Sequence, residues 1–132
     1  MFVDASAIVA ILTREPDADH LSASLVRAKN PITSAIAIFE AAVGIARKRN
    51  IPVELVQSEL EVFLSAAKIC TVEISGAEAS EAISTFSRYG KGQGHPAQLN
   101  LGDCFAYAVA KTNCVPLLFK GNDFSKTDLS LA

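Results

Sequence analysis

The chain opens with MFVDASAIVAIL, residues 1 to 12, in which Asp4 is the single charged side chain. Residues 1–4 have the composition of a short buried strand, and the apolar residues 5–12 predict a helix that follows it. Burying a lone carboxylate is costly unless it is neutralised, paired or bound to a cation. Asp4 therefore either caps the following helix, a position that Asp favours, or belongs to a binding site.

The rest of the chain alternates predicted helices with predicted strands. A Ser75–Glu78 capping box starts one helix, and Asn100 caps another. Such alternation predicts an α/β fold with a parallel sheet covered on both faces, in which ligands bind beyond the carboxyl ends of the strands. The remaining predicted strands are 68–74, 115–119 and a short one at 128–131, and the other predicted helices are 34–49 and two that begin at Pro16 and Pro52.

Length and composition predict one compact domain, residues 1–132, because half of the side chains are hydrophobic. No apolar run approaches the roughly 20 residues that span a bilayer, and the start of the chain lacks the basic segment of a signal peptide. The three cysteines have no CxxC spacing, which favours reduced thiols in a cytoplasmic protein. The net charge of −2 argues against broad nucleic-acid binding but allows a local basic rim.

Three further acids occupy places comparable to that of Asp4. Glu40 lies within a helix, on the flank of an apolar stripe formed by Ile36, Phe39 and Val43. Asp103 falls in the first turn of the helix that Asn100 caps, and Asp123 follows the predicted strand 115–119. Two of these acids can be explained without a binding site: Asp103 completes a capping box with Asn100, and Asp123 suits an ordinary turn. Glu40 has no such explanation.

A single cation site accounts for all four acids at once. Carboxylates that lie within a few ångströms of each other repel, and they either take up protons or bind a cation. Oxygen ligands without His or Cys select Mg²⁺, with Mn²⁺ as an accepted substitute, rather than zinc. Such a site serves in-line phosphodiester cleavage, because the metal activates water and stabilises charge on the phosphate.

The ordered acids and the motifs VDASAIVAIL, LNLGDCFAYAVAK and PLLFKGNDF resemble the PIN-domain ribonucleases, and more narrowly the VapC toxins of toxin–antitoxin pairs. The resemblance covers essentially the whole chain. It implies a three-layer α/β/α fold with a short, mostly parallel sheet of about five strands. It further implies a Mg²⁺-dependent endoribonuclease, a homodimer, an RNA substrate such as tRNA or rRNA, and a cognate VapB-type antitoxin.

Carried over by position, Asp4 and Asp103 match the principal metal ligands of that family. Glu40 matches the helix glutamate that binds metal or orients the attacking water, and Ser6 matches a hydroxyl residue that steadies the first carboxylate. Many relatives carry the fourth acid two residues before Asp123, so we rank Asp123 below the other three. Asn122 is available beside it as a neutral partner.

Basic residues are spread over elements that lead to the same edge of the predicted sheet. The candidates for RNA phosphate binding are Arg47, Arg49, Lys91 and Lys120, although Arg47 to Arg49 equally suit a helix C-terminus. The helix 34–49 also has a second apolar face with Ile38 and Ile45. That face indicates either a contact with another subunit or a helix wedged between two layers of its own domain.

Two other functions compete with the nuclease. A receiver-like signalling domain also binds Mg²⁺ through acids, but it requires paired acids at the first strand and an acceptor Asp after a middle strand. The first strand here offers one acid, and the segment KICTVEI ends without an Asp. A catalytically inactive PIN-like scaffold is the second alternative, because sequence alone does not show catalytic geometry.

Overall fold

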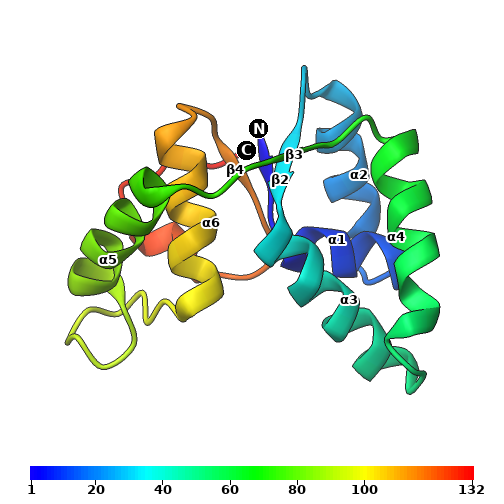
Figure 1. Ribbon diagram of the computed structural model, residues 1–132, viewed down its shortest axis with the longest axis horizontal. Helices are drawn as coiled ribbons and strands as arrows, with labels where there is room; N and C mark the ends of the chain where they lie inside the picture. The colour runs from blue at the N-terminus through cyan, green and yellow to red at the C-terminus, as the bar shows by residue number, and fades with distance from the viewer.

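A four-stranded parallel sheet forms the centre of the computed structural model, which describes residues 1–132 (Figure 1). The strand order is β3-β2-β1-β4, and Phe2 of β1 pairs with Ile32 on one side and Leu117 on the other. The chain crosses from strand to strand through helices, as parallel pairing requires. The strands are β1 (Phe2–Val3), β2 (Ile32–Ser34), β3 (Cys70–Val72) and β4 (Leu117–Leu118).

Helices cover both faces of this sheet, which gives the expected three-layer α/β/α arrangement. Figure 1 shows the helices α1 to α4 on one side of the sheet and the pair α5 and α6 on the other, with both termini close together. The helices are α1 (Ala5–Leu12), α2 (Ala18–Arg27), α3 (Ala35–Arg49), α4 (Glu54–Ala66), α5 (Gly76–Tyr89) and α6 (Leu101–Thr112), followed by a 3₁₀ turn, η1 (Phe124–Lys126). No helix is long and apolar enough to cross a membrane.

Side-chain caps fix where α1, α3, α5 and α6 begin, whereas α2 and α4 start without one. The Asp4 carboxylate accepts a hydrogen bond from the Ser6 amide at 2.9 Å and so caps α1. Ser34 caps α3, and the Ser75–Glu78 capping box starts α5 as the sequence predicts. Each cap satisfies amides that the first helical turn leaves unpaired.

The core lies around β1 and β4, which the two helical layers enclose. Phe2, Val3 and Leu117 are fully buried, and Tyr107 of α6 is among the largest buried side chains. Strands that are covered on both faces are apolar on both, which explains why residues 1–3 lack a polar alternation. The apolar start of the chain is therefore the centre of the fold.

The structure differs from the sequence prediction in the number and length of strands. Strand β2 was not predicted, because three residues after Pro31 carry too little periodicity to stand out. The predicted strand 128–131 is reduced to a single parallel bridge between Leu131 and Leu117. The sheet therefore has four strands rather than about five.

The structure decides between the two explanations for the second apolar face of α3, and it corrects the predicted inner face of α5. The core face of α3 contains Ala37, Ala41 and Ile45, whereas Phe39 is 69 % exposed. The face with Ile45 is thus wedged within the domain, and the stripe with Phe39 is the partly open one. In α5, helical spacing predicts that Ala82, Ile83 and Phe86 face inward, but only Ala82 is buried, whereas Ile83 is 73 % and Phe86 42 % exposed. A helix with apolar residues on two faces does not reveal from periodicity which face packs inward.

Candidate active site

Three of the acids that the sequence singles out meet in one open pocket of about 360 Å³, together with Glu15. Asp4 stands where β1 ends and α1 begins, Glu40 comes from α3, and Asp103 comes from the first turn of α6. The pocket therefore lies at the carboxyl end of β1, where parallel sheets collect ligands. Its lining residues are Asp4, Ala5, Ser6, Val9, Glu15, Glu40, Asp103 and Lys120.

Asp4 is buried and is held by Ser6. Its Oδ2 accepts hydrogen bonds from the Ser6 amide and from the Ser6 hydroxyl. The Ser6 hydroxyl in turn accepts a hydrogen bond from the Lys120 amide at 3.0 Å, which ties the segment after β4 to the start of α1. Burial raises the pKa of Asp4; the Ser6 hydrogen bonds oppose this rise, and the charge of Asp123 adds to it.

Glu40 is half-buried and lies against α6. Burial raises its pKa to about 7, and the negative charges of Asp4 and Asp103 act in the same direction. Its carboxylate touches the backbone at Gly102, where a Cβ atom would stand 2.2 Å from Oε2. A glycine at this position therefore allows Glu40 to reach the pocket at all.

Asp103 combines a cap with a place in the pocket. Its Oδ2 accepts a hydrogen bond from the Asn100 amide at 3.0 Å, and Asn100 accepts one from the Asp103 amide at 2.9 Å. Asp103 thus does cap α6 as the sequence predicts, but the cap uses only one of its two carboxylate oxygens. Burial raises the pKa of Asp103 to about 6, the Asn100 hydrogen bond opposes this, and the charges of Asp4 and Asp123 add to the rise.

Asp123 stands at the border of the site. It is exposed, it precedes η1, and it does not line the pocket, yet its charge raises the pKa of both Asp4 and Asp103. Asn122 is also exposed, and its backbone carbonyl accepts a hydrogen bond from the Ser125 hydroxyl at 2.6 Å. The side chain of Asn122 makes no hydrogen bond.

The four basic candidates are placed very differently. Lys120 lines the acidic pocket. Arg49 is held by Glu59 and by the Leu12 carbonyl, the latter at 2.8 Å, so it serves the packing of α3. Arg47 and Lys91 are exposed, form no ion pair and do not line the acidic pocket.

Comparison with known protein families identifies the family to which this fold belongs. The family model of the PIN domain matches residues 1–129. The chain belongs to the PIN-domain family. Its relatives within that family are VapC ribonucleases: one from Rhizobium meliloti is 42 % identical, covering 97 % of this chain and 98 % of the relative. One from Mycolicibacterium smegmatis is 40 % identical and covers 98 % of each chain. The chain is therefore a VapC-type PIN domain.

Solved structures support the same fold at much lower identity. VapC20 of Mycobacterium tuberculosis, a toxin that cleaves the sarcin-ricin loop, superposes with a TM-score of 0.77 at 12 % identity over 99 % of this chain and 97 % of that one. A toxin–antitoxin complex from Klebsiella pneumoniae gives 0.71 at 17 % identity over 99 % and 95 %. The second of these structures holds a toxin together with its antitoxin.

The donor set of this PIN domain fits a hard divalent cation. All candidate ligands are carboxylate oxygens. Burial is the main cause of the raised pKa values of Glu40 and Asp103, and the charge of Asp4 raises both further, so a bound cation would favour the ionised forms. No three Asp, Glu, His or Cys side chains come close enough to form a ligand set on their own. Mg²⁺ needs no such set, because it binds one or two carboxylates directly and keeps several waters.

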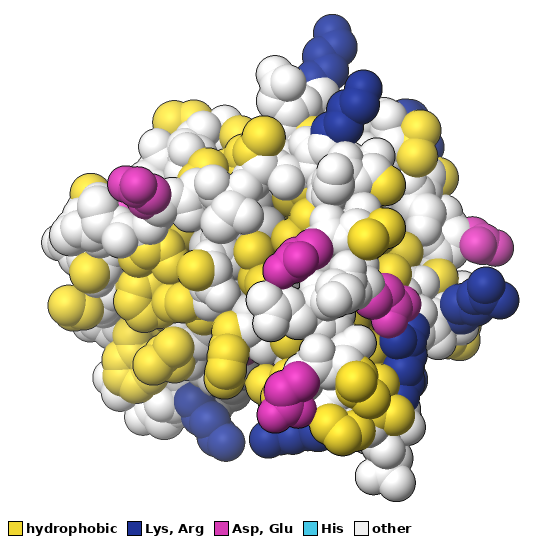
Figure 2. Space-filling view, turned by 45° about the vertical axis from the view of Figure 1, so that its right-hand side comes forward, with side chains coloured by type: hydrophobic (Ala, Val, Ile, Leu, Met, Phe, Trp, Pro, Cys, Tyr) yellow, Lys and Arg dark blue, Asp and Glu magenta, His cyan; other side chains and the backbone are white.

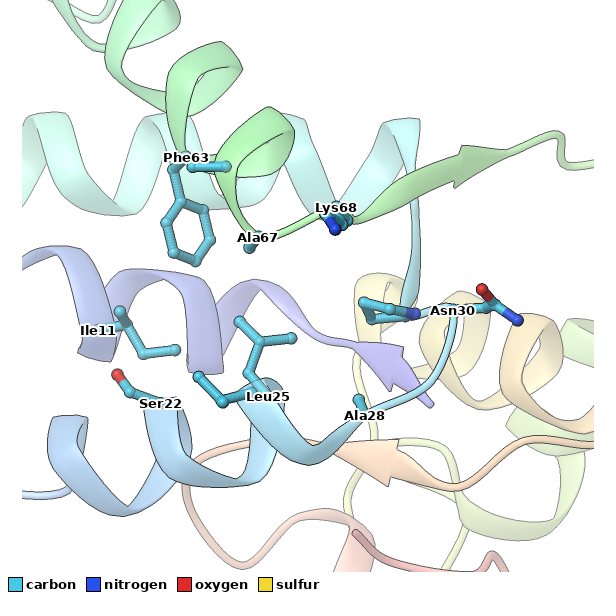
Figure 3. A pocket seen from close by; sticks show the side chains of 11 residues that line it. Ile11, Ser22, Leu25, Ala28, Asn30, Phe63, Ala67 and Lys68 are labelled. Atoms are coloured by element: carbon cyan, nitrogen blue, oxygen red, sulfur yellow. The ribbon is translucent and has the colours of Figure 1, made fainter.

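A second, apolar pocket of this PIN domain lies away from the acids. It measures about 590 Å³ and is lined mainly by α2 and α4. Figure 3 shows Leu25, Phe63 and Ile11 converging on it from three helices. It contains no acidic side chain, so it is distinct from the candidate active site.

Two residues of the site were missed from the sequence. Glu15 lines the pocket, although the sequence offers it only as the end of an apolar stretch. Gly102 was missed because its role is the absence of a side chain next to Glu40. The signal that would have revealed this close packing is a glycine inside a predicted helix, one residue before a candidate acid.

Proposed function

We propose that this single domain, residues 1–132, is a cytoplasmic, Mg²⁺-dependent endoribonuclease that acts as the toxin of a VapBC-type toxin–antitoxin pair. The observation that carries the proposal is the convergence of Asp4, Glu40 and Asp103 on one pocket at the carboxyl end of the sheet. These residues lie far apart in sequence, and only Asp4 and Asp103 have capping roles that would explain their position without a ligand.

Each acid has a role that its surroundings suit. Asp4 and Asp103 have one carboxylate oxygen held by the protein and the other turned to no protein donor, so they are the proposed cation ligands. Glu40, with a pKa of about 7, is suited to binding the cation or to holding and moving a proton of the attacking water. When bound, Mg²⁺ supplies a Lewis acid that activates water and stabilises charge on the phosphate. Asp123 supports the site from its border.

The proposed substrate is RNA, with tRNA and rRNA as candidates. The pocket is open, and one lysine, Lys120, stands among its acids. A lysine ammonium binds a backbone phosphate without reading the base, so Lys120 is the first candidate for a flanking phosphate. Arg47 and Lys91 are exposed and free for more distant phosphates, whereas Arg49 is engaged within the protein.

We also propose a homodimer through the face of α5 and α6. Figure 2 shows hydrophobic side chains gathered on the left of the molecule, the side on which these helices lie in Figure 1. Ile83 and Phe86 of α5 and Leu101 of α6 are exposed and line a wholly apolar hollow of about 260 Å³. A second copy would cover this surface with an identical one across a two-fold axis. The cognate antitoxin is the other proposed partner.

The alternatives are separated from this function by different observations. The match of residues 1–129 to the PIN-domain model excludes the receiver-like signalling domain. An inactive PIN-like scaffold would share the fold and the relatives, and it differs only in having no catalysis.

The experiment is cleavage of a total RNA pool, with defined tRNAs alongside, by the purified protein in Mg²⁺ and in EDTA. We expect discrete cuts in Mg²⁺, none in EDTA, and recovery of cleavage when Mn²⁺ replaces Mg²⁺. Equal cleavage with and without EDTA would rule out the metal mechanism. No cleavage in any RNA, together with no binding of Mn²⁺ by calorimetry, would favour the inactive scaffold.

A further inference from the structure

Glu15 holds two lysines from distant parts of the chain at the edge of the acidic pocket. Its Oε1 pairs with the Lys48 ammonium at the end of α3, and its Oε2 pairs with the Lys120 ammonium after β4. The Glu15 side chain is only 14 % exposed, while those of Lys48 and Lys120 are 44 % and 35 % exposed. Both oxygens of one nearly buried carboxylate are therefore committed to cations.

The backbone fixes the position of Glu15. Arg14 adopts a left-handed conformation with φ of 53°, and the Glu15 amide donates to the Ala10 carbonyl at 2.9 Å. The Arg14 amide donates to the Ile11 carbonyl at 3.3 Å, so α1 ends in a Schellman motif. This motif presents the Glu15 carboxylate toward the pocket from a backbone that hydrogen bonds hold in place.

Lys120 is anchored at two points as a result. Its amide donates to the Ser6 hydroxyl at 3.0 Å, and that hydroxyl donates to Asp4. Its ammonium is held by Glu15. Lys120 lines the same pocket as Asp4, Glu40 and Asp103, and without a tether its ammonium would be drawn to their charges and would compete with a divalent cation.

We propose that Glu15 is a positioning residue, which holds the Lys120 ammonium at the rim of the pocket so that it binds an RNA phosphate next to the cleaved one. The inference rests on the proposed nuclease function and extends it to a residue outside the four acids. Glu15 itself touches neither RNA nor cation. Its effect passes through Lys120.

The direction in which Glu15→Gln changes the RNA affinity distinguishes this positioning role from simple charge repulsion between Glu15 and RNA. Replacing Glu15 with Gln removes a negative charge from a surface that binds a polyanion, which alone would tighten RNA binding. Loss of the tether has the opposite effect, because Lys120 turns toward the acids and no longer meets the phosphate. The two accounts therefore predict changes of opposite direction for the same variant.

The test compares Glu15→Gln, Lys120→Gln and the double variant with the wild-type protein. Binding of a fluorescent single-stranded RNA is measured in EDTA over a range of KCl concentrations, and KM and kcat are measured in Mg²⁺. Glu59→Gln is the matched control, because Glu59 also pairs with a basic side chain, Arg49, but does not line the pocket. Thermal unfolding of each variant verifies the fold.

We expect Glu15→Gln to weaken RNA binding and raise KM by about tenfold with little change in kcat, which is the loss of about one phosphate contact. The slope of log affinity against log salt should fall by about 0.7, the value for one contact on a single strand. Lys120→Gln should weaken RNA binding by the same factor as Glu15→Gln. The double variant should bind RNA no more weakly than Lys120→Gln alone. Glu59→Gln should resemble wild type.

Tighter or unchanged RNA binding in Glu15→Gln, or additive effects in the double variant, would overturn the positioning role. Because RNA binding is measured without Mg²⁺, this outcome is distinct from failure of the nuclease function. If RNA binding by the wild-type protein depends on Lys120 and on its tether to Glu15 but no RNA is ever cleaved, the positioning role stands and the proposed hydrolysis is wrong.

Discussion

The backbone of Gly102 lies directly against the carboxylate of Glu40, so that a Cβ on residue 102 would stand 2.2 Å from Oε2 and 2.4 Å from Cδ. This contact joins α3 to the first turn of α6, one residue before Asp103. Glu40 therefore reaches its place beside Asp103 because residue 102 has no side chain.

Gly102→Ala tests this contact. The added methyl group should displace Glu40 from the pocket and lower the rate of RNA cleavage by about a hundredfold, the cost of a misplacement of about 1 Å. Gly76→Ala is the matched control, because Gly76 also lies in the first turn of a helix and a Cβ there meets nothing within 4 Å. Equal activity of the two variants would show that the Glu40 position does not depend on Gly102.

The stability of the protein in EDTA should fall as the pH rises. Glu40 has a pKa of about 7 against an ordinary 4.5, and Asp103 about 6 against 3.8. Because the folded state binds these protons more tightly, their contribution is full below the ordinary values and is lost as the pH passes through about 6 to about 7.

Thermal unfolding in EDTA between about pH 5 and about pH 8 measures this loss. Glu40→Gln should flatten the profile, and Mg²⁺ should restore stability at the alkaline end, since it binds the ionised carboxylates. A wild-type profile that is flat over this range, or that rises with pH, would contradict the burial of Glu40 and Asp103 beside Asp4.

Asp123→Asn should lower cleavage by about tenfold, less than a change at Asp4, Glu40 or Asp103, because Asp123 acts on the site only through its charge. Initial rates at saturating Mg²⁺ measure the effect. A complete loss of cleavage would place Asp123 among the cation ligands, and wild-type activity would reduce it to a turn residue.

Ile83→Glu should convert the proposed dimer into a monomer without unfolding it, because Ile83 is 73 % exposed and a charge there opposes its own copy. Light scattering coupled to gel filtration measures the mass. Val62→Glu on α4 is the control, since Val62 is 69 % exposed and does not line the apolar hollow. A wild-type monomer, or dimers of both variants, would rule out this face.

Local signals in the sequence predict most of the helices. The caps at Ser75 and Asn100 lie where the sequence predicts them, because a cap depends on side chains within three residues of it. The four ordered acids also point to a site at the edge of the sheet, since the ends of parallel strands meet there. These features need no knowledge of distant contacts.

Features that depend on distant contacts were missed or misassigned. Strand β2 exists through its pairing with β1 and β3 rather than through its own three residues. The inner face of α3 is decided by close packing, as where a Cβ on Gly44 would stand 3.0 Å from Val9. Glu15 reaches the pocket only because α1 ends in a left-handed turn at Arg14.

The central claim is that the buried Asp4 carboxylate serves a cation that cleaves RNA. The most direct measurement compares the wild-type protein with Asp4→Asn on the same RNA at the same Mg²⁺ concentration, with unfolding temperatures recorded for both. The account predicts no cleavage by Asp4→Asn, in a protein that stays folded because Asn still caps α1. Cleavage at the wild-type rate would contradict it and leave Asp4 as a helix cap alone.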